Sequence, residues 1–283
     1  MTREEIKVKN LDTVAEFVKG LYKKPQLRHL YFELTEKCNL NCFHCGSSCD
    51  GSKGHGLSLD KYKDILSDVK DNVKDKPMIF LTGGEPLLYP SFFELVEHIH
   101  NEGFNWGMTS NGLFITDEVA KRLKDAGMFS ISISIDGLPE SHDRYRGVKG
   151  AYDRAMRGID ALIQNEACKN VMVTTVVNHE NINELDALLD VMNGIDIDEW
   201  RLLGIEPIGR AEDSKDMLLT PDDYKRFMEF VKEKRKEGLP VEYGCCHYLG
   251  LNYEVEVRDW YWFCNSGVHT ASIRVDRDRK SVV

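Results

Sequence analysis

The residues most able to do chemistry are three cysteines near the N-terminus. Cys38, Cys42 and Cys45 are separated by three and by two residues. Thiolates are soft ligands, and three on one short loop can hold three corners of a soft metal centre. A structural zinc site usually has four protein ligands, often as two paired cysteine units. The spacing therefore favours an iron–sulfur cluster with one open iron, which a substrate or cofactor could bind.

Two plainer interpretations fit the same cysteines. Cys49 could supply the fourth ligand of a zinc site, or the thiols could be buried without any metal. The start of the chain has no apolar signal segment, so we expect a cytoplasmic protein in a reducing compartment. In that setting, eight cysteines with close spacing indicate metal or redox chemistry rather than a disulfide framework.

Composition excludes several classes of protein. The chain has 283 residues, 42% of them hydrophobic and 30% charged, which is typical of a globular protein with one large domain or two modest ones. No apolar run approaches the roughly 18 residues that cross a membrane, so we expect no membrane partner. The formal net charge is −10, so the chain is not basic overall, as nucleic-acid-binding domains usually are, and we expect no nucleic-acid partner.

The elements that must position the cysteines follow an alternating pattern. Apolar β-rich runs alternate with segments whose apolar residues recur every three or four positions. Six such units predict a parallel sheet with right-handed crossovers and strands covered on both faces. Six units are fewer than the eight of a closed barrel, so a partial barrel and a doubly wound sheet both fit. The predicted strands are His29–Leu34, Met78–Thr82, Phe104–Thr109, Ser130–Ile135, Val171–Val177 and Glu199–Pro207. The predicted helices, with their capping residues, span approximately Leu59–Val73, Ser91–Glu102, Thr116–Ala126, Gly150–Asn165, Glu184–Met192 and Thr220–Gly238.

Short polar turns follow several of these strands. The cysteine loop follows the first, Gly83-Gly84-Glu85 the second, Thr109-Ser-Asn-Gly112 the third, and Ser134-Ile-Asp136-Gly137 ends the fourth. Carboxyl ends of parallel strands meet at one edge of a sheet, where ligands bind in such folds. The turns are therefore expected to form one site.

In this order, the motifs resemble those of radical S-adenosylmethionine (radical SAM) enzymes over roughly residues 30–210. The resemblance implies a partial (β/α)6 barrel, a [4Fe-4S] cluster held by Cys38, Cys42 and Cys45, and bound SAM. The ring at position 44 and Ile205 would lie near adenine, the Gly-Gly-Glu turn would bind the amino group, and an arginine would pair with the carboxylate. The SAM-binding residues implied in this way are His44, Gly83, Gly84, Glu85, Ser134 and Arg154.

The end of the chain resembles the start of a SPASM or twitch extension, in which extra cysteines hold auxiliary iron–sulfur clusters. Two interpretations of Cys264, Cys245 and Cys246 stay open: a partial or altered auxiliary cluster, or buried or free thiols. The resemblance is incomplete, because Arg279 stands where a glycine is expected and the chain ends one residue before an expected cysteine. We therefore expect either a truncated chain or a degenerate auxiliary site. The predicted organisation is an N-terminal helical arm (1–28), a radical SAM core (29–238) and an incomplete extension (239–283).

The resemblance implies an oxidoreductase that cleaves SAM reductively and abstracts hydrogen from a peptide or protein substrate, with an external electron donor. His142-Asp-x-x-Arg146-Gly147 and the SPASM-like ending resemble peptide- and protein-modifying members of the family. A small-molecule cofactor-biosynthesis enzyme is the second hypothesis. A non-catalytic zinc or iron–sulfur binding module is the third, and it belongs to a different class of protein.

Overall fold

The computed structural model describes residues 2–244 and 247–274. The predicted auxiliary ligands Cys245 and Cys246, and the end of the chain around Arg279, lie outside the described residues. Among the described residues, no helix is long and apolar enough to cross a membrane.

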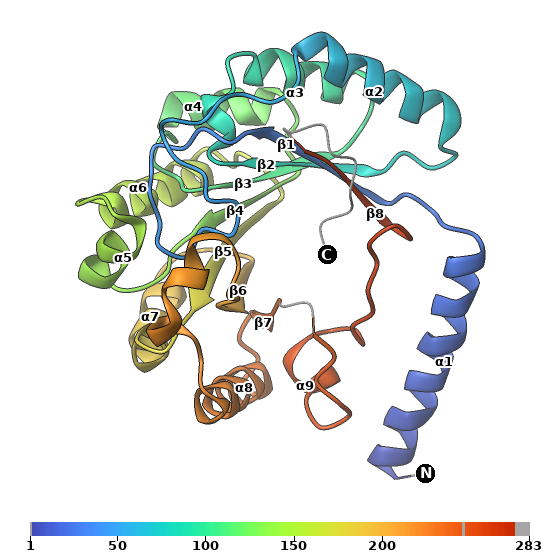
Figure 1. Cartoon of the computed structure of the whole chain (residues 1–283), viewed down its shortest axis with the longest axis vertical. Helices are drawn as coiled ribbons and strands as arrows, with labels where there is room; N and C mark the ends of the chain where they lie inside the picture. Colours follow the sequence, from blue (N-terminus) through green and yellow to red (C-terminus); the bar gives the residue numbers. More distant parts are fainter. Residues whose placement is uncertain (1, 245–246, 275–283) are drawn as a thin grey trace.

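Eight parallel strands form one sheet in the order β7-β6-β5-β4-β3-β2-β1-β8. Neighbouring strands in this sheet mostly follow each other in sequence, and β7 and β8 form its two edges. Figure 1 shows that the sheet curves like the wall of a barrel that stays open. The strands are β1 (His29–Thr35), β2 (Met78–Gly83), β3 (Trp106–Ser110), β4 (Ser130–Ser134), β5 (Asn170–Val177), β6 (Glu199–Gly204), β7 (Val241–Tyr243) and β8 (Thr270–Ile273). The fold is thus an α/β partial barrel, as predicted.

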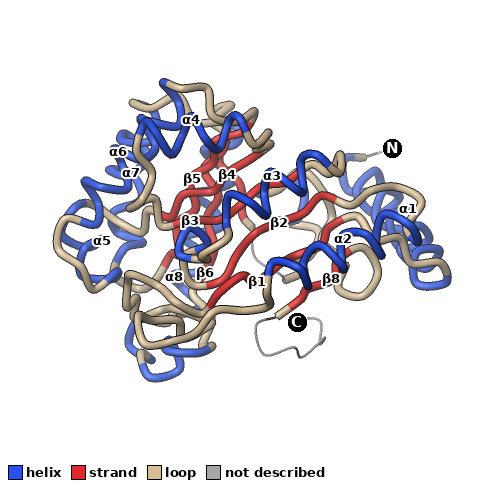
Figure 2. The backbone as a smooth tube through the Cα atoms, turned by 90° about the horizontal axis from the view of Figure 1, so that it is seen from above, coloured by secondary structure: helices blue, strands red, loops and turns tan. Residues whose placement is uncertain are grey.

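Helices cover the convex side of the sheet, as Figures 1 and 2 show. They are α2 (Leu59–Asn72), α3 (Phe92–Asn101), α4 (Asp117–Asp125), α5 (Pro139–Arg146), α6 (Ala151–Gln164), α7 (Leu185–Asn193) and α8 (Pro221–Lys236), while α1 (Arg3–Lys23) and α9 (Glu254–Val257) lie on the open side. Between the sheet and these helices lies the main core, where Phe32, Ile79, Leu81, Ile131 and Ile133 are fully buried.

The strands are not covered equally on both faces, contrary to the expectation from their apolar runs. Burial alternates along β1, β2, β5 and β6, so every second side chain is only partly buried. These partly buried side chains, such as Tyr31 and Phe80, alternate with core residues, so they lie on the opposite face of the sheet. This is the concave face, on which Figure 1 shows no layer of helices. A concave face of this kind leaves room for a ligand inside the curve of the sheet.

The six predicted strands are confirmed as β1–β6, with boundaries that shift by one to three residues at some ends. All six predicted helices are found, as α2, α3, α4, α6, α7 and α8. The sequence pattern missed α5, because its mean composition is strongly polar and only part of one turn carries apolar residues. It also missed β7 and β8, which are only three and four residues long.

The segment after residue 238, which we expected to be an extension, takes part in the sheet. β7 pairs with β6, and β8 pairs with β1 at the opposite edge. The N-terminal arm packs on this segment, since Lys7 Nζ lies 2.6 Å from Glu256 Oε1 and the Tyr261 hydroxyl donates to the Lys7 carbonyl (2.9 Å). Helix α1 therefore packs on the segment around α9, on the open side of the barrel (Figure 1).

Candidate functional site

A cavity of about 280 Å³ lies where the strands end, on the concave side of the sheet. Residues from the carboxyl ends of five strands line it, namely Thr82 and Gly83 of β2, Thr109 and Ser110 of β3, Ser134 of β4, Thr174 and Val176 of β5 and Leu203 of β6. Four thiols of the loop after β1 line the same cavity: Cys38, Cys42, Cys45 and Cys49. The structure thus brings the predicted cysteine loop and strand-end turns to one place.

Two glycines at the end of β2, Gly83 and Gly84, let the chain fold tightly onto the start of the cysteine loop. Gly83 has φ +140°, and a Cβ there would lie 2.2 Å from the Thr35 carbonyl oxygen. A Cβ on Gly84 would lie 2.3 Å from the Lys37 carbonyl oxygen. Main-chain hydrogen bonds run across this contact from Gly84 to Thr35 (2.6 Å) and from Glu85 to Lys37 (3.0 Å). Chain-to-chain packing thus requires both glycines, and both also line the cavity, so their predicted contact with a ligand stays a prediction.

The C-terminus of α5 supports the other side of the cysteine loop. The N–H groups of Asn41 and Phe43 donate to the carbonyls of Arg146 (3.4 Å) and Tyr145 (3.2 Å). Carbonyls in the last turn of a helix have no partner within the helix, so the loop satisfies two of them. Cys42 therefore sits directly over the end of α5.

A segment after β6 closes over the loop. Gly209 has φ +59°, and a Cβ there would meet the Cys45 carbonyl oxygen at 2.5 Å. Arg210 donates through Nε to the Cys42 carbonyl (2.7 Å) and through Nη1 to the Cys49 carbonyl (2.9 Å). The backbone of the cysteine loop is thus fixed from three directions, by β2, α5 and this segment.

The three predicted cluster thiols have different surroundings. Burial raises the pKa of Cys38 to about 11, although the Leu40 N–H lies 3.4 Å from its sulfur. Burial also raises the pKa of Cys42, and the Arg146 guanidinium opposes this change. A hydrogen bond from the Cys49 thiol lowers the pKa of Cys45 to about 5. Cys49, which the sequence argument considered only as a zinc ligand, is thus a neighbour that stabilises the Cys45 thiolate.

Glu85 does not line the cavity with its side chain. It is fully buried behind the turn, where its carboxylate accepts hydrogen bonds from Ser110 Oγ (3.0 Å) and the Asn111 N–H (2.9 Å). Asn111 Nδ2 in turn lies 3.9 Å from Cys38 Sγ and 2.8 Å from Asn39 Oδ1. Glu85 therefore connects the turn after β2 to the turn after β3, and through Asn111 to the cysteine loop.

Burial raises the pKa of Glu85 to about 7, above its ordinary 4.5, against the effect of its hydrogen bonds. The unfolded chain therefore loses this proton at lower pH than the folded chain, so ionisation of Glu85 makes the fold less stable as pH rises towards 7 and beyond. We expect the stability of Glu85→Gln relative to wild type to rise by up to about 3 kcal/mol between about pH 4.5 and about pH 7, and to stay level above that range. Urea unfolding of the cluster-free protein at about pH 5 and about pH 8 measures the difference. If the stability difference between Glu85→Gln and wild type does not grow between these two pH values, the raised pKa of Glu85 is contradicted.

The remaining predicted site residues fall into two groups. His44 and Ser134 line the cavity with the thiols, and His44 Nε2 lies 3.1 Å from Asp136 Oδ2. Arg154 is exposed on α6 and does not line it, because Nη2 donates to the Leu113 carbonyl (3.1 Å). Ile205 is buried beside Tyr145 in a small second core cluster. The Cys264 carbonyl accepts from the Tyr22 hydroxyl (3.4 Å), in the segment that packs on α1.

Sequence reasoning noted Arg146 and Asp136 without giving them a role in the site. Arg146 is buried, lines the cavity and lies 3.7 Å from Cys42 Sγ through Nη1. Its Nη2 lies 2.6 Å from Asp136 Oδ2. The sequence feature that could have identified Arg146 is the stretch His142-Asp-x-x-Arg146-Gly147, in which Arg146 is the last residue of α5 and Gly147 caps the helix.

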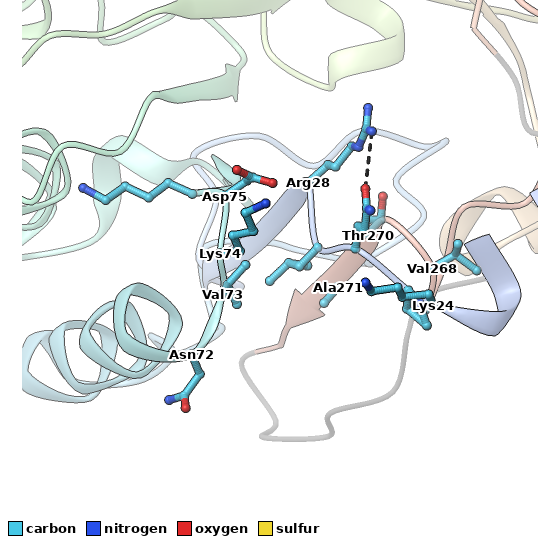
Figure 3. A pocket seen from close by; sticks show the side chains of 14 residues that line it. Lys24, Arg28, Asn72, Val73, Lys74, Asp75, Val268, Thr270 and Ala271 are labelled. Carbon is cyan, nitrogen blue, oxygen red and sulfur yellow. Dashed lines mark hydrogen bonds between the residues drawn. The ribbon is translucent and has the colours of Figure 1, made fainter. Parts of the chain in front are cut away.

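A larger cavity, of about 790 Å³, lies elsewhere (Figure 3). Connections before β1 and β2 and the segment before β8 enclose it, so it lies at the amino ends of these strands. Its lining includes Lys24, Arg28, Lys74 and Lys76, and it contains no thiol. Since ligands in parallel α/β folds bind at the carboxyl ends of strands, the smaller cavity is the better candidate site.

The donor set of the smaller cavity fits an iron–sulfur cluster. Three thiols from one loop line it, and cluster cysteines bind different irons rather than one common ion. Within residues 2–244 and 247–274, no group of three or more His, Cys, Asp or Glu side chains could hold a single metal ion. Polar side chains from the strand ends, Thr82, Thr109 and Ser134, line the space beside the thiols. Their hydroxyl groups can bond a polar cofactor such as SAM.

Comparison with known proteins gives a family match. Residues 32–192 match the family model of the radical SAM superfamily. The chain is 32% identical over 228 residues to an AdoMet-dependent heme synthase from Methanosarcina barkeri, covering 79% of this chain and 64% of that protein. It is 33% identical over 195 residues to the mycofactocin maturase MftC from Mycolicibacterium smegmatis, covering 67% of this chain and 47% of that protein.

A solved structure shares the fold. The crystal structure of Streptococcus suis SuiB bound to the precursor peptide SuiA aligns with a TM-score of 0.72 and 18% identity, covering 94% of this chain and 62% of that chain. At this identity the likeness shows the fold alone. The chain spans about half to two thirds of the length of these proteins.

Proposed function

Because this chain belongs to the radical SAM superfamily of enzymes, we propose that it cleaves SAM reductively at a [4Fe-4S] cluster held by Cys38, Cys42 and Cys45. The observation that carries this proposal is the cavity in which these three thiols meet the ends of β2–β6. Fixed backbone on three sides of the cysteine loop supports it, because a cluster site must be held in place before the metal binds.

When bound, the cluster and SAM supply an electron and a reactive nucleoside fragment that removes hydrogen from a substrate, with an external donor providing the electron. The chain's own residues position and enclose these groups. Gly83 and Ser134 line the space beside the thiols, where main-chain and hydroxyl groups can bond the polar end of SAM. His44, held by Asp136, forms one wall and would lie against adenine.

Two residues predicted to bind SAM do not face the cavity, and their proposed roles differ. Arg154 would have to rearrange to reach SAM, and Glu85 would act through the residues that it holds. Arg154 donates to the Leu113 carbonyl, so pairing with the carboxylate of SAM would replace this hydrogen bond. Glu85 is buried behind the turn and holds Ser110 and Asn111. We therefore propose that Glu85 shapes the turn, and that Gly84 and its neighbours present main-chain groups to the amino group of SAM.

For the substrate, we propose a tetrapyrrole as the first candidate class. The heme synthase of Methanosarcina barkeri matches this chain over a larger share of both proteins than MftC does. On the concave face, the rings of Tyr31 and Phe80 stack at 4.9 Å with an angle of 18° between them. They lie on the same face as Thr82 of the cavity, two residues closer to the amino ends of their strands. A flat conjugated substrate could pack on this aromatic surface.

A peptide is the second candidate class, although the sequence argument ranked it first. MftC is named a maturase, and the SuiB structure contains a precursor peptide. The two edge strands of the described sheet, β7 and β8, support this class, because an extended peptide can pair with an edge strand. An auxiliary cluster at Cys264, Cys245 and Cys246 stays a prediction within this second class.

The test is anaerobic reconstitution with iron and sulfide, followed by a SAM cleavage assay with a chemical reductant. About four irons per chain and production of 5′-deoxyadenosine support the proposal, and about eight irons would indicate an auxiliary cluster. Mass spectrometry after incubation with iron porphyrins bearing carboxylate chains, or with precursor peptides, then separates the two substrate classes. One tightly bound zinc per chain with no SAM cleavage contradicts the proposal and favours the binding module.

A further inference from the structure

A buried charge network lies beneath the cysteine loop, and one member of it, Arg146, has no role in the function proposed so far. At its centre is Asp136, which follows β4 and is fully buried. Its Oδ1 accepts from the Val176 N–H (2.9 Å), and its carbonyl accepts from Asn181 Nδ2 (2.7 Å). Its own N–H donates to His142 Nδ1 (3.0 Å). These hydrogen bonds fix the main chain and one carboxylate oxygen of Asp136 beneath the cysteine loop.

The second oxygen of this carboxylate faces the cysteine loop. Asp136 Oδ2 lies 2.6 Å from Arg146 Nη2 and 3.1 Å from His44 Nε2. Arg146 Nη1 then lies 3.7 Å from Cys42 Sγ, within the range of a hydrogen bond to sulfur. The Asp136 carboxylate thus holds the Arg146 guanidinium against Cys42. The same carboxylate also holds the His44 ring, next to Cys45 in the chain.

The charges in this network persist at neutral pH. Burial alone would raise the pKa of Asp136, but the Arg146 guanidinium and His44 bring it below its ordinary range. Burial alone would lower the pKa of Arg146, but Asp136 and the Cys42 sulfur raise it. Burial lowers the pKa of His142 to about 4, so this ring is neutral beside the pair. The guanidinium is therefore the permanent positive charge at Cys42.

We propose that Arg146 is a positioning residue that fixes the sulfur of Cys42 and offsets its negative charge when a cluster is bound. This inference rests on the proposed function. A buried positive charge beside a cluster ligand stabilises the reduced, more negative state, because charges interact strongly where water is excluded. Arg146 thereby raises the reduction potential of the cluster, and the Asp136 carboxylate partly offsets this effect while it holds the guanidinium in place.

The experiment compares full-length reconstituted variants by redox titration followed by electron paramagnetic resonance. Arg146→Met is expected to shift the midpoint potential of the cluster to a more negative value, since it removes the positive charge. Asp136→Asn is expected to shift it to a more positive value, since the negative charge is gone; the amide oxygen can still accept from Arg146, with loss of the hydrogen bond from the Val176 N–H. Arg157→Met, the same substitution at an exposed position of α6, is the matched control.

Opposite shifts in the two network variants support the inference, because a purely structural disturbance has no reason to change sign. A midpoint potential of Arg146→Met equal to that of Arg157→Met overturns it, and so does a shift in the same direction for Asp136→Asn. If Arg146→Met binds no cluster, the Arg146→Lys variant, which keeps the positive charge, is measured instead. Cluster loading in Arg146→Lys supports a role for the charge, and failure of this variant to load a cluster overturns the inference. Absence of a cluster in wild type and Arg157→Met would instead contradict the proposed function itself.

Discussion

Cys42→Ala is expected to lose iron–sulfur loading and to reduce 5′-deoxyadenosine production to the background of a reaction without enzyme. Cys42 is 7% exposed and lines the cavity, with its backbone fixed by α5 and by Arg210. Removing one of three thiolate ligands leaves an iron without a protein ligand, so the cluster should not persist. Iron content, visible absorption after reconstitution and a SAM cleavage assay measure the loss.

The fold of this variant should survive, because deletion of one small buried side chain costs about 1 kcal/mol on average. Cys168→Ala is the matched control. Cys168 is partly buried outside the cavity, where its thiol donates to the Asn170 carbonyl (3.2 Å), and it should keep wild-type loading. Retained SAM cleavage in Cys42→Ala would show that the cysteine loop is not the cluster site.

Gly84→Ala should disrupt both the stability of the protein and its site. The new Cβ would lie 2.3 Å from the Lys37 carbonyl oxygen and 2.7 Å from the Lys37 carbonyl carbon. These are backbone atoms that cannot rotate away, so the turn after β2 must move off the cysteine loop. We expect a loss of about 3 kcal/mol or more in the free energy of unfolding. This corresponds to a fall of about 6–12 °C in Tm, together with weaker SAM binding.

Thermal unfolding of the cluster-free protein and SAM binding to the reconstituted protein measure these two effects. Gly54→Ala is the matched control, because no atom lies within 4 Å of its added Cβ and its carbonyl still accepts from the Glu36 N–H. A Gly84→Ala variant as stable as Gly54→Ala would mean that the loop and the turn are not in the close contact described here.

The order of strands and helices could be predicted from the sequence because each depends on local chemistry. Period-three-and-four apolar patterns fixed α2 and α6, and β-branched runs fixed β4 and β5, before any contact was known. The ends of such patterns were less certain, as in β3, where Phe104 and Asn105 precede the strand. Short elements such as β7 carry too few residues for a period, and only pairing with β6 makes β7 a strand.

For the site, sequence alone determined which residue types follow which strands, and the rule that parallel strands end together placed them at one edge. It could not determine direction or contact. Glu85 faces inward to Ser110 and Asn111 because the turn at Gly83 and Gly84 packs against the main chain of Lys37. Arg146 reaches Cys42 because α5 ends beneath the cysteine loop. Hydrogen bonds and charge pairs of this kind join residues that are far apart in the chain. Their geometry exists only once the strands have paired and the loops have packed on one another, and so tertiary structure decided which polar residues line the cavity and which only support it.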